Sequence, residues 1–259
     1  MAVVKDAVAD TDIGQITLYG DISDTSWWGD EITPAQFKAD LDNLGDVKNI
    51  DIYINSGGGD VFAGYAIYNM LKRHSAKKTV YIDGLAASIA SLIAMAGDEI
   101  VMPSNSMMMI HNAWAVVAGN KTDLRDMADQ LDKVDGLLVD TYVKKTGLEQ
   151  DEVVAMLDNE TWLTASEAVE KGFATRLEEP TAVAASIDPK FYDRYHNVPE
   201  TLNNRGESEP VEEDIPQPVE EVEQAETAEA PNNLEEQRKD FNRIRRKIYE
   251  RKIMKGKTE

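Results

Sequence analysis

Two patterns of apolar residues alternate along the chain as far as residue 177. Short runs rich in isoleucine and valine are typical of strands buried in a sheet, and apolar residues three or four positions apart are typical of helices. Strands are expected at residues 13–20, 47–54, 79–82, 99–102, 107–110 and 173–177. Helices are expected at 35–44, 61–74, 121–145 and 148–157, from 88 onward, and from 165 to the glycine at 172. This alternation predicts an α/β fold with a mostly parallel sheet and right-handed βαβ connections.

Local signals mark the starts of two of these helices. Thr33 followed by Pro34 predicts an N-cap and a first helical residue, and Gly45 is expected to end that helix. Thr164 and Glu167 have the spacing of a capping box, which predicts the start of the last helix of the domain.

Three segments that could carry chemistry each follow a predicted strand. They are the glycine-rich loop at 55–60, Ser88 and His111. The functional loops of a parallel sheet lie at the carboxyl ends of its strands. We therefore expect these three segments to meet at one edge of the sheet.

Ser88 follows a run of small residues and precedes an apolar stretch. A serine hydroxyl is a weak nucleophile at neutral pH unless a base lies within hydrogen-bond reach. A helix that begins here leaves the N–H of Ile89 without an intrahelical acceptor, so this group could stabilise an oxyanion. Ser88 is thus either an ordinary N-cap of a buried helix or a nucleophile, whereas Ser91 is interpreted as a small packing residue.

His111 ends the apolar run MMMI and therefore emerges from a buried strand. It is either a structural, hydrogen-bonded histidine or the base that activates Ser88. The other two histidines are expected to take no part. His74 lies among basic residues at a helix end, and His196 lies in a region of weak structural signals.

The loop at 55–60, NSGGGD, joins a strand to a helix. It lacks the GK[ST] ending of a phosphate-binding P-loop and the GxGxxG spacing of a dinucleotide site. A turn that lets a substrate backbone approach Gly57 and Gly58 is the favoured interpretation, and a plain tight turn is the alternative. Two acids, Asp158 and Glu160, precede the last capped helix, and either could orient a histidine or be a surface carboxylate.

Composition narrows the range of functions. The chain has 259 residues, a formal net charge of −21 and no cysteine, which excludes disulfides, thiolate metal sites and cysteine nucleophiles. The negative charge argues against nucleic-acid binding. No apolar stretch is long enough for a membrane span, and no secretory signal is visible. We expect a cytoplasmic protein with no cofactor and no metal.

The charge changes sign abruptly near the C-terminus. Residues 207–229 hold ten acids and no Lys or Arg, whereas residues 238–257 hold ten bases. We expect a catalytic domain at 1–180, a weakly structured extension at 181–205, an acidic disordered linker at 206–232 and a basic helical tail at 233–259.

Three ordered segments resemble the ClpP family of serine peptidases, and most closely the ClpP-related head maturation proteases of tailed phages. They are INSGGGDVFAGYAIYNML, GLAASIASLIAMAGDEIVMPSNSMMMIHN and ETWLTASEAVEKGFA, and the resemblance covers about residues 13–178. It implies a ClpP/crotonase-like fold of repeated ββα units. It also implies Ser88 as nucleophile, His111 as base, and oxyanion donors at the N–H groups of Gly59 and Ile89.

Two departures from the family pattern matter. The family's third triad residue is usually Asp, but Glu160 stands at this position, which leaves Asp158 as an alternative. Gly57 stands where the family commonly has proline. The resemblance also implies a homo-oligomeric ring that uses the helix at 121–145. The alternative is that the whole apolar stripe of this helix packs within its own chain.

The resemblance implies an ATP-independent serine endopeptidase that cleaves phage capsid or scaffold proteins in the assembling prohead, in the cytoplasm of the host. No ATPase motif is present in the sequence. A scaffolding or assembly protein on a degenerate peptidase fold is one alternative. A crotonase-type acyl-CoA enzyme is another, because that related fold also uses paired N–H groups as an oxyanion hole.

Overall fold

A computed structural model describes residues 12–26, 31–180 and 195–199 of the chain. All of them fall within one unit, Met1–Glu207. The predicted acidic linker and basic tail lie outside the described residues, as does most of the predicted extension at 181–205.

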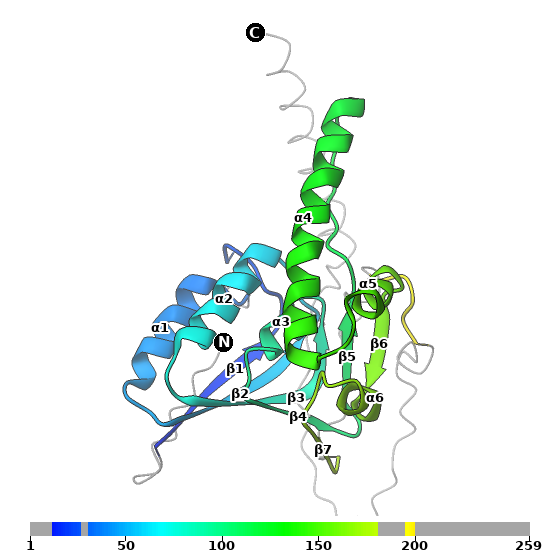
Figure 1. The fold of residues 1–259 in the computed structure, drawn as a ribbon. Helices are drawn as coiled ribbons and strands as arrows, with labels where there is room; N and C mark the ends of the chain where they lie inside the picture. The colour runs from blue at the N-terminus through cyan, green and yellow to red at the C-terminus, as the bar shows by residue number, and fades with distance from the viewer. Residues whose placement is uncertain (1–11, 27–30, 181–194, 200–259) are drawn as a thin grey trace, which may run out of the picture. The chain divides into compact units, whose positions relative to one another are not determined.

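The fold is α/β, as predicted, and is built on a seven-stranded sheet (Figure 1). Its strands are β1 (Ile13–Tyr19), β2 (Asn49–Ser56), β3 (Lys77–Ala87), β4 (Glu99–Pro103), β5 (Met107–Ile110), β6 (Thr161–Thr164) and β7 (Arg176–Glu178). Strands β1, β2, β3, β4 and β7 are neighbours in that order and run parallel. Strand β5 pairs in parallel with the end of β3, and β6 pairs antiparallel with β5.

Six helices complete the described part of the chain. They are α1 (Pro34–Leu44), α2 (Val61–Arg73), α3 (Ile89–Ala94), α4 (Lys121–Thr146), α5 (Gln150–Asp158) and α6 (Ala165–Glu170). Helices α1, α2 and α3 lie on one side of β1–β4, and α4 rises on that same side and extends beyond the sheet (Figure 1). Both predicted caps are confirmed, because Thr33 accepts a hydrogen bond from the N–H of Gln36 and Thr164 forms a capping box with Glu167.

The central strands form because apolar and polar residues alternate along them. On β2, the side chains of Ile50, Ile52 and Ile54 are fully buried, whereas Asp51 and Tyr53 on the other face are partly exposed. Such alternation is typical of a strand with one covered face. The covered face packs on the helices and makes the main hydrophobic core.

Several predicted bounds were wrong. Strand β3 was expected at 79–82 but continues to Ala87, because its small residues pair with β5 instead of starting the helix. Strand β6 was not predicted. Strand β7 was expected at 173–177 but begins later in the chain, at Arg176, and ends at Glu178. Helix α3, which was expected from residue 88 onward, begins at Ile89 and ends at Ala94.

Helix α4 is buried only near its C-terminal end. Leu138, Val139 and Tyr142 belong to the core, whereas Leu124 and Leu137 are about half exposed. Within the described part of the chain, the apolar stripe of this helix is therefore only partly buried.

Candidate active site

Ser88 stands at the sharp turn between β3 and α3. Its φ angle is +55°, a value that non-glycine residues adopt rarely and at a cost of about 1–3 kcal/mol. Its side chain makes no capping bond to the helix, so the interpretation as an ordinary N-cap is wrong. The turn is held by the N–H of Ser88, which donates to the carbonyl of Met109, and by Oγ of Ser91, which donates to the carbonyl of Ser88 at 2.6 Å.

The pairing of β3 with β5 brings His111 to Ser88. Ala87 is opposite Met109 in this parallel register, so strands β3 and β5 both end at the same edge of the sheet. Nε2 of His111 lies 2.8 Å from Oγ of Ser88. The sequence prediction that these residues form a pair thus has direct geometric support.

The environment of His111 favours a neutral imidazole. Burial lowers its pKa from the ordinary value, the charge of Glu160 raises it, and the nearby His196 lowers it. The net effect is a lowered pKa, so Nε2 is free of a proton at neutral pH when the other ring nitrogen carries it. A neutral imidazole in hydrogen-bond contact with a serine hydroxyl can act as a general base.

The glycine loop lies directly against Ser88. A Cβ atom on Gly58 would come 2.7 Å from Cβ of Ser88, and one on Gly59, whose φ is +148°, would come 1.9 Å from the carbonyl oxygen of Ile22. The N–H of Ile22 donates to the carbonyl of Gly58, and the N–H of Asp60 donates to the carbonyl of Ile22. Ile22 is thus joined to the glycine loop by a parallel β-bridge whose hydrogen bonds are made by the two neighbours of Gly59. In such a bridge the N–H of the central residue, Gly59, points away from Ile22.

The two candidate acids have different partners. Oδ1 of Asp158 accepts a hydrogen bond of 2.7 Å from the side-chain amide of Asn112. Glu160 is 9% exposed and has a φ of +46°, and its charge acts on His111. Among the described residues, no hydrogen bond joins Glu160 to His111.

A segment that sequence reasoning set aside also reaches the site. The N–H groups of His196 and Asn197 donate to Oε1 of Glu160 at 2.8 and 2.7 Å. The ring of Tyr195 stands edge-on to His111, with centroids 5.4 Å apart. His196, which was expected to take no part, lies next to the candidate acid Glu160. These contacts are mostly made by backbone groups, which leave no signature in a sequence.

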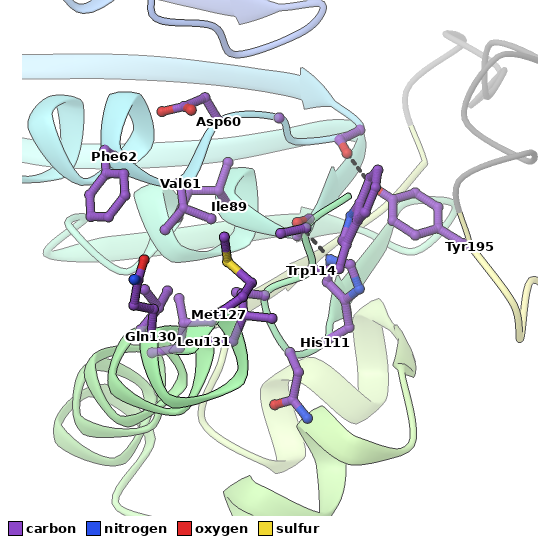
Figure 2. A pocket seen from close by; sticks show the side chains of 18 of the residues that line it. Asp60, Val61, Phe62, Ile89, His111, Trp114, Met127, Gln130, Leu131 and Tyr195 are labelled. Atoms are coloured by element: carbon purple, nitrogen blue, oxygen red, sulfur yellow. Dashed lines mark hydrogen bonds between the residues drawn. The ribbon is translucent and has the colours of Figure 1, made fainter. Parts of the chain in front are cut away.

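A pocket of about 470 Å³ opens beside the Ser88–His111 pair. Figure 2 shows apolar side chains from three helices on one side, among them Val61 and Phe62 of α2 and Met127 and Leu131 of α4. His111, Trp114 and Tyr195 lie on the other side (Figure 2). Gly57 and Gly59 line the pocket, whereas Gly58 packs behind them on Ser88.

Two further searches of the described residues gave negative results. No cluster of three or more His, Asp or Glu side chains is arranged to hold a metal ion. None of the helices in this part of the chain combines the length and the apolar character that crossing a membrane requires.

Comparison with known proteins places this chain in a family. Residues 15–180 match the Clp protease family. The chain is 33% identical over 144 residues to an ATP-dependent Clp protease proteolytic subunit of Deinococcus radiodurans, an alignment that covers 54% of this chain and 70% of the relative. It is 34% identical over 135 residues to the proteolytic subunit 1 of Protochlamydia amoebophila, over 50% of this chain and 65% of the relative.

A third relative, the proteolytic subunit of Bacteroides fragilis, is 35% identical over 135 residues, which is 51% of this chain and 65% of the relative. The chain thus spans about two thirds of the length of these curated relatives. The prediction of a serine peptidase with a ClpP-like fold is confirmed at the level of the family. The chain belongs to the Clp protease family.

Proposed function

We propose that this protein is an ATP-independent serine endopeptidase in which Ser88 is the nucleophile and His111 the base. The observation that carries the proposal is the 2.8 Å contact between Oγ of Ser88 and Nε2 of His111. It is supported by the strained φ of Ser88, because such strain persists only where the surrounding structure imposes it and is frequent at active sites.

The geometry supports acyl transfer in two stages. Oγ of Ser88 attacks the scissile carbonyl carbon while Nε2 of His111 takes the hydroxyl proton. The N–H groups of Gly59 and Ile89 stabilise the oxyanion of the tetrahedral intermediate. His111 then gives its proton to the leaving amine as the C–N bond breaks. Water, activated by the same imidazole, hydrolyses the acyl-enzyme and restores Ser88.

Glu160 is proposed as the acid of the triad. Its carboxylate is nearly buried and its charge raises the pKa of His111, which stabilises the imidazolium formed during the reaction. Asp158 is the weaker candidate, because its Oδ1 is engaged by Asn112.

We propose that the active form is a homo-oligomeric ring. The support is the apolar surface that α4 leaves uncovered, which includes Leu124 at 47% and Leu137 at 53% exposure. Exposed apolar patches on a folded domain often mark interfaces with other chains. A second copy of this chain is the proposed partner.

The proposed substrates are the capsid or scaffold proteins of a tailed phage, cleaved in the assembling prohead within the host cytoplasm. The support is the resemblance of the three ordered motifs to phage head maturation proteases. The basic tail at 233–259 is proposed to recruit the enzyme to an acidic partner such as the capsid or scaffold, on the basis of its charge.

Co-expression with the neighbouring capsid gene tests this function. The wild type is expected to give capsid fragments whose masses define the cleavage sites, and Ser88→Ala is expected to give only the intact protein. Intact capsid protein with both variants would contradict the proposal. Cleavage and assembly that proceed equally with Ser88→Ala would favour a scaffolding protein on a degenerate peptidase fold.

The third candidate, a crotonase-type acyl-CoA enzyme, needs no activated serine. The hydrogen bond between Ser88 and His111 therefore argues for hydrolysis.

A further inference from the structure

The segment Tyr195–Asn197 contacts three separate parts of the proposed catalytic site. It lies beyond residues 15–180, which match the family. Figure 2 shows Tyr195 beside His111, with its hydroxyl directed at the glycine loop. The first contact is the hydrogen bond that this hydroxyl donates to the carbonyl of Gly57. The bond fixes a peptide group in a run of three glycines, which would otherwise have wide conformational freedom.

The second contact is with the base. The ring of Tyr195 stands edge-on to the ring of His111, at a centroid distance of 5.4 Å and an interplanar angle of 83°. It makes a similar contact with Trp162 on β6, at 5.7 Å. Tyr195 therefore forms part of the apolar wall that buries the imidazole.

The third contact is with the acid. Two consecutive backbone N–H groups, from His196 and Asn197, converge on Oε1 of Glu160. The side-chain amide of Asn197 also donates to the carbonyl of Asn159 at 2.9 Å, which fastens the segment beside the carboxylate. The indole N–H of Trp162 is a more distant donor to the same oxygen, at 3.4 Å.

A catalytic acid is usually held in place by a hydrogen bond to the histidine that it orients. Here the carboxylate of Glu160 is held instead by the N–H groups of His196 and Asn197. In the described part of the chain, Glu160 acts on His111 through its charge and not through a hydrogen bond. A glutamate side chain has three rotatable bonds, so a carboxylate that is not tied to the histidine needs another restraint to stay beside it. The two N–H groups of the segment supply that restraint.

We propose that Tyr195–Asn197 is a positioning segment that holds Glu160 beside His111 and fixes the Gly57 carbonyl, so that acid, base and oxyanion loop are aligned for catalysis. This inference rests on the proposed peptidase function. It assigns a catalytic use to backbone groups beyond the residues that match the family.

The test uses the full-length protein and the rate at which a fluorophosphonate labels Ser88, measured across pH. Asn197→Pro removes one of the two N–H donors. It is expected to slow labelling about tenfold, the effect of about 1.4 kcal/mol. It is also expected to move the acid limb of the profile to lower pH, because a carboxylate that is no longer held raises the pKa of His111 less. The matched control is Val198→Pro, one residue further on, which is expected to label within about twofold of the wild type.

Tyr195→Phe tests the other end of the segment while retaining every backbone N–H group. It keeps the ring beside His111 but loses the bond to Gly57. We expect the labelling rate to fall about fivefold, the effect of one net hydrogen bond of about 1 kcal/mol, with the acid limb of the pH profile unchanged. If Asn197→Pro fails to fold by circular dichroism, this variant decides the question.

If the folded variants are labelled at the wild-type rate and with the wild-type acid limb of the pH profile, the inference is overturned and the proposed function still stands. Faster labelling by Asn197→Pro, with the acid limb at higher pH, would also overturn it, because the segment would then be restraining the acid from reaching His111. A wild-type protein that is not labelled at all would overturn the proposed function and this inference with it.

Discussion

The hydroxyl of Tyr142 lies 2.8 Å from Oγ of Ser91, and this contact joins α4 to the helix that follows the nucleophile. The single proton of Ser91 goes to the carbonyl of Ser88, so Tyr142 is the donor. Burial raises the pKa of Tyr142, which keeps its hydroxyl protonated. The turn that carries Ser88 is thus tied to the core through two consecutive hydrogen bonds.

Tyr142→Phe is expected to lower the free energy of unfolding by about 0.5–1.5 kcal/mol, since one buried hydrogen bond is lost. Peptidase activity should fall less than tenfold, because Ser91 still holds the carbonyl of Ser88. Denaturant unfolding measures the first quantity. The control is Tyr68→Phe, whose hydroxyl has no hydrogen-bond partner among the described residues; an equal loss of stability there would contradict the account.

Gly59→Ala is expected to reduce kcat/KM by about 100-fold or more, the effect of losing one oxyanion donor. The reason is steric, because the new Cβ would meet the carbonyl of Ile22 at 1.9 Å at a φ unfavourable for alanine. Gly136→Ala on α4 is the matched control. A Cβ there meets no atom within 4 Å, so this change should leave activity intact and stabilise the helix by up to about 1 kcal/mol. Similar activity in both variants would exclude the proposed oxyanion loop.

The pH profile distinguishes the two candidate acids. The charge of Glu160 raises the pKa of His111. Glu160→Gln removes that charge, so the pKa of His111 falls and the imidazole stays neutral to lower pH. The acid limb of kcat/KM should move to lower pH while kcat falls by about tenfold or more. Asp158→Asn should leave the limb in place. A shift in the Asp158 variant alone would reverse the assignment.

The pocket beside Ser88 predicts the preferred substrate. Its wall includes Val61 and Ile89 as well as Met127 and Leu131 of α4. Peptides with a large apolar residue before the scissile bond should be cleaved at least tenfold faster than matched peptides with an acidic residue, because an apolar pocket does not compensate a desolvated carboxylate. A library of fluorogenic peptides measures this ratio, and a preference for acidic residues would show that another surface binds the substrate.

The proposed pair could be predicted from the sequence because His111 directly follows an apolar run and Ser88 stands between small residues and an apolar stretch. The end of β3 could not, because Gly84, Ala86 and Ala87 have low strand propensity and are in the sheet only through their pairing with β5. The strand β6 was missed for a different reason, because its four residues, TWLT, hold only two apolar side chains.

The surroundings of Glu160 were also beyond sequence reasoning. They depend on backbone N–H groups of His196 and Asn197, which every residue except proline can supply. The positive φ of Ser88 is likewise imposed by tertiary structure, because no local residue preference favours it.

The central claim is that His111 activates Ser88, and covalent labelling tests it most directly. Full-length protein treated with a fluorophosphonate at neutral pH should be modified at one residue, located by tandem mass spectrometry. The account predicts that this residue is Ser88 and that His111→Ala abolishes the labelling. Modification of a different serine, or equal labelling of the His111 variant, would contradict it.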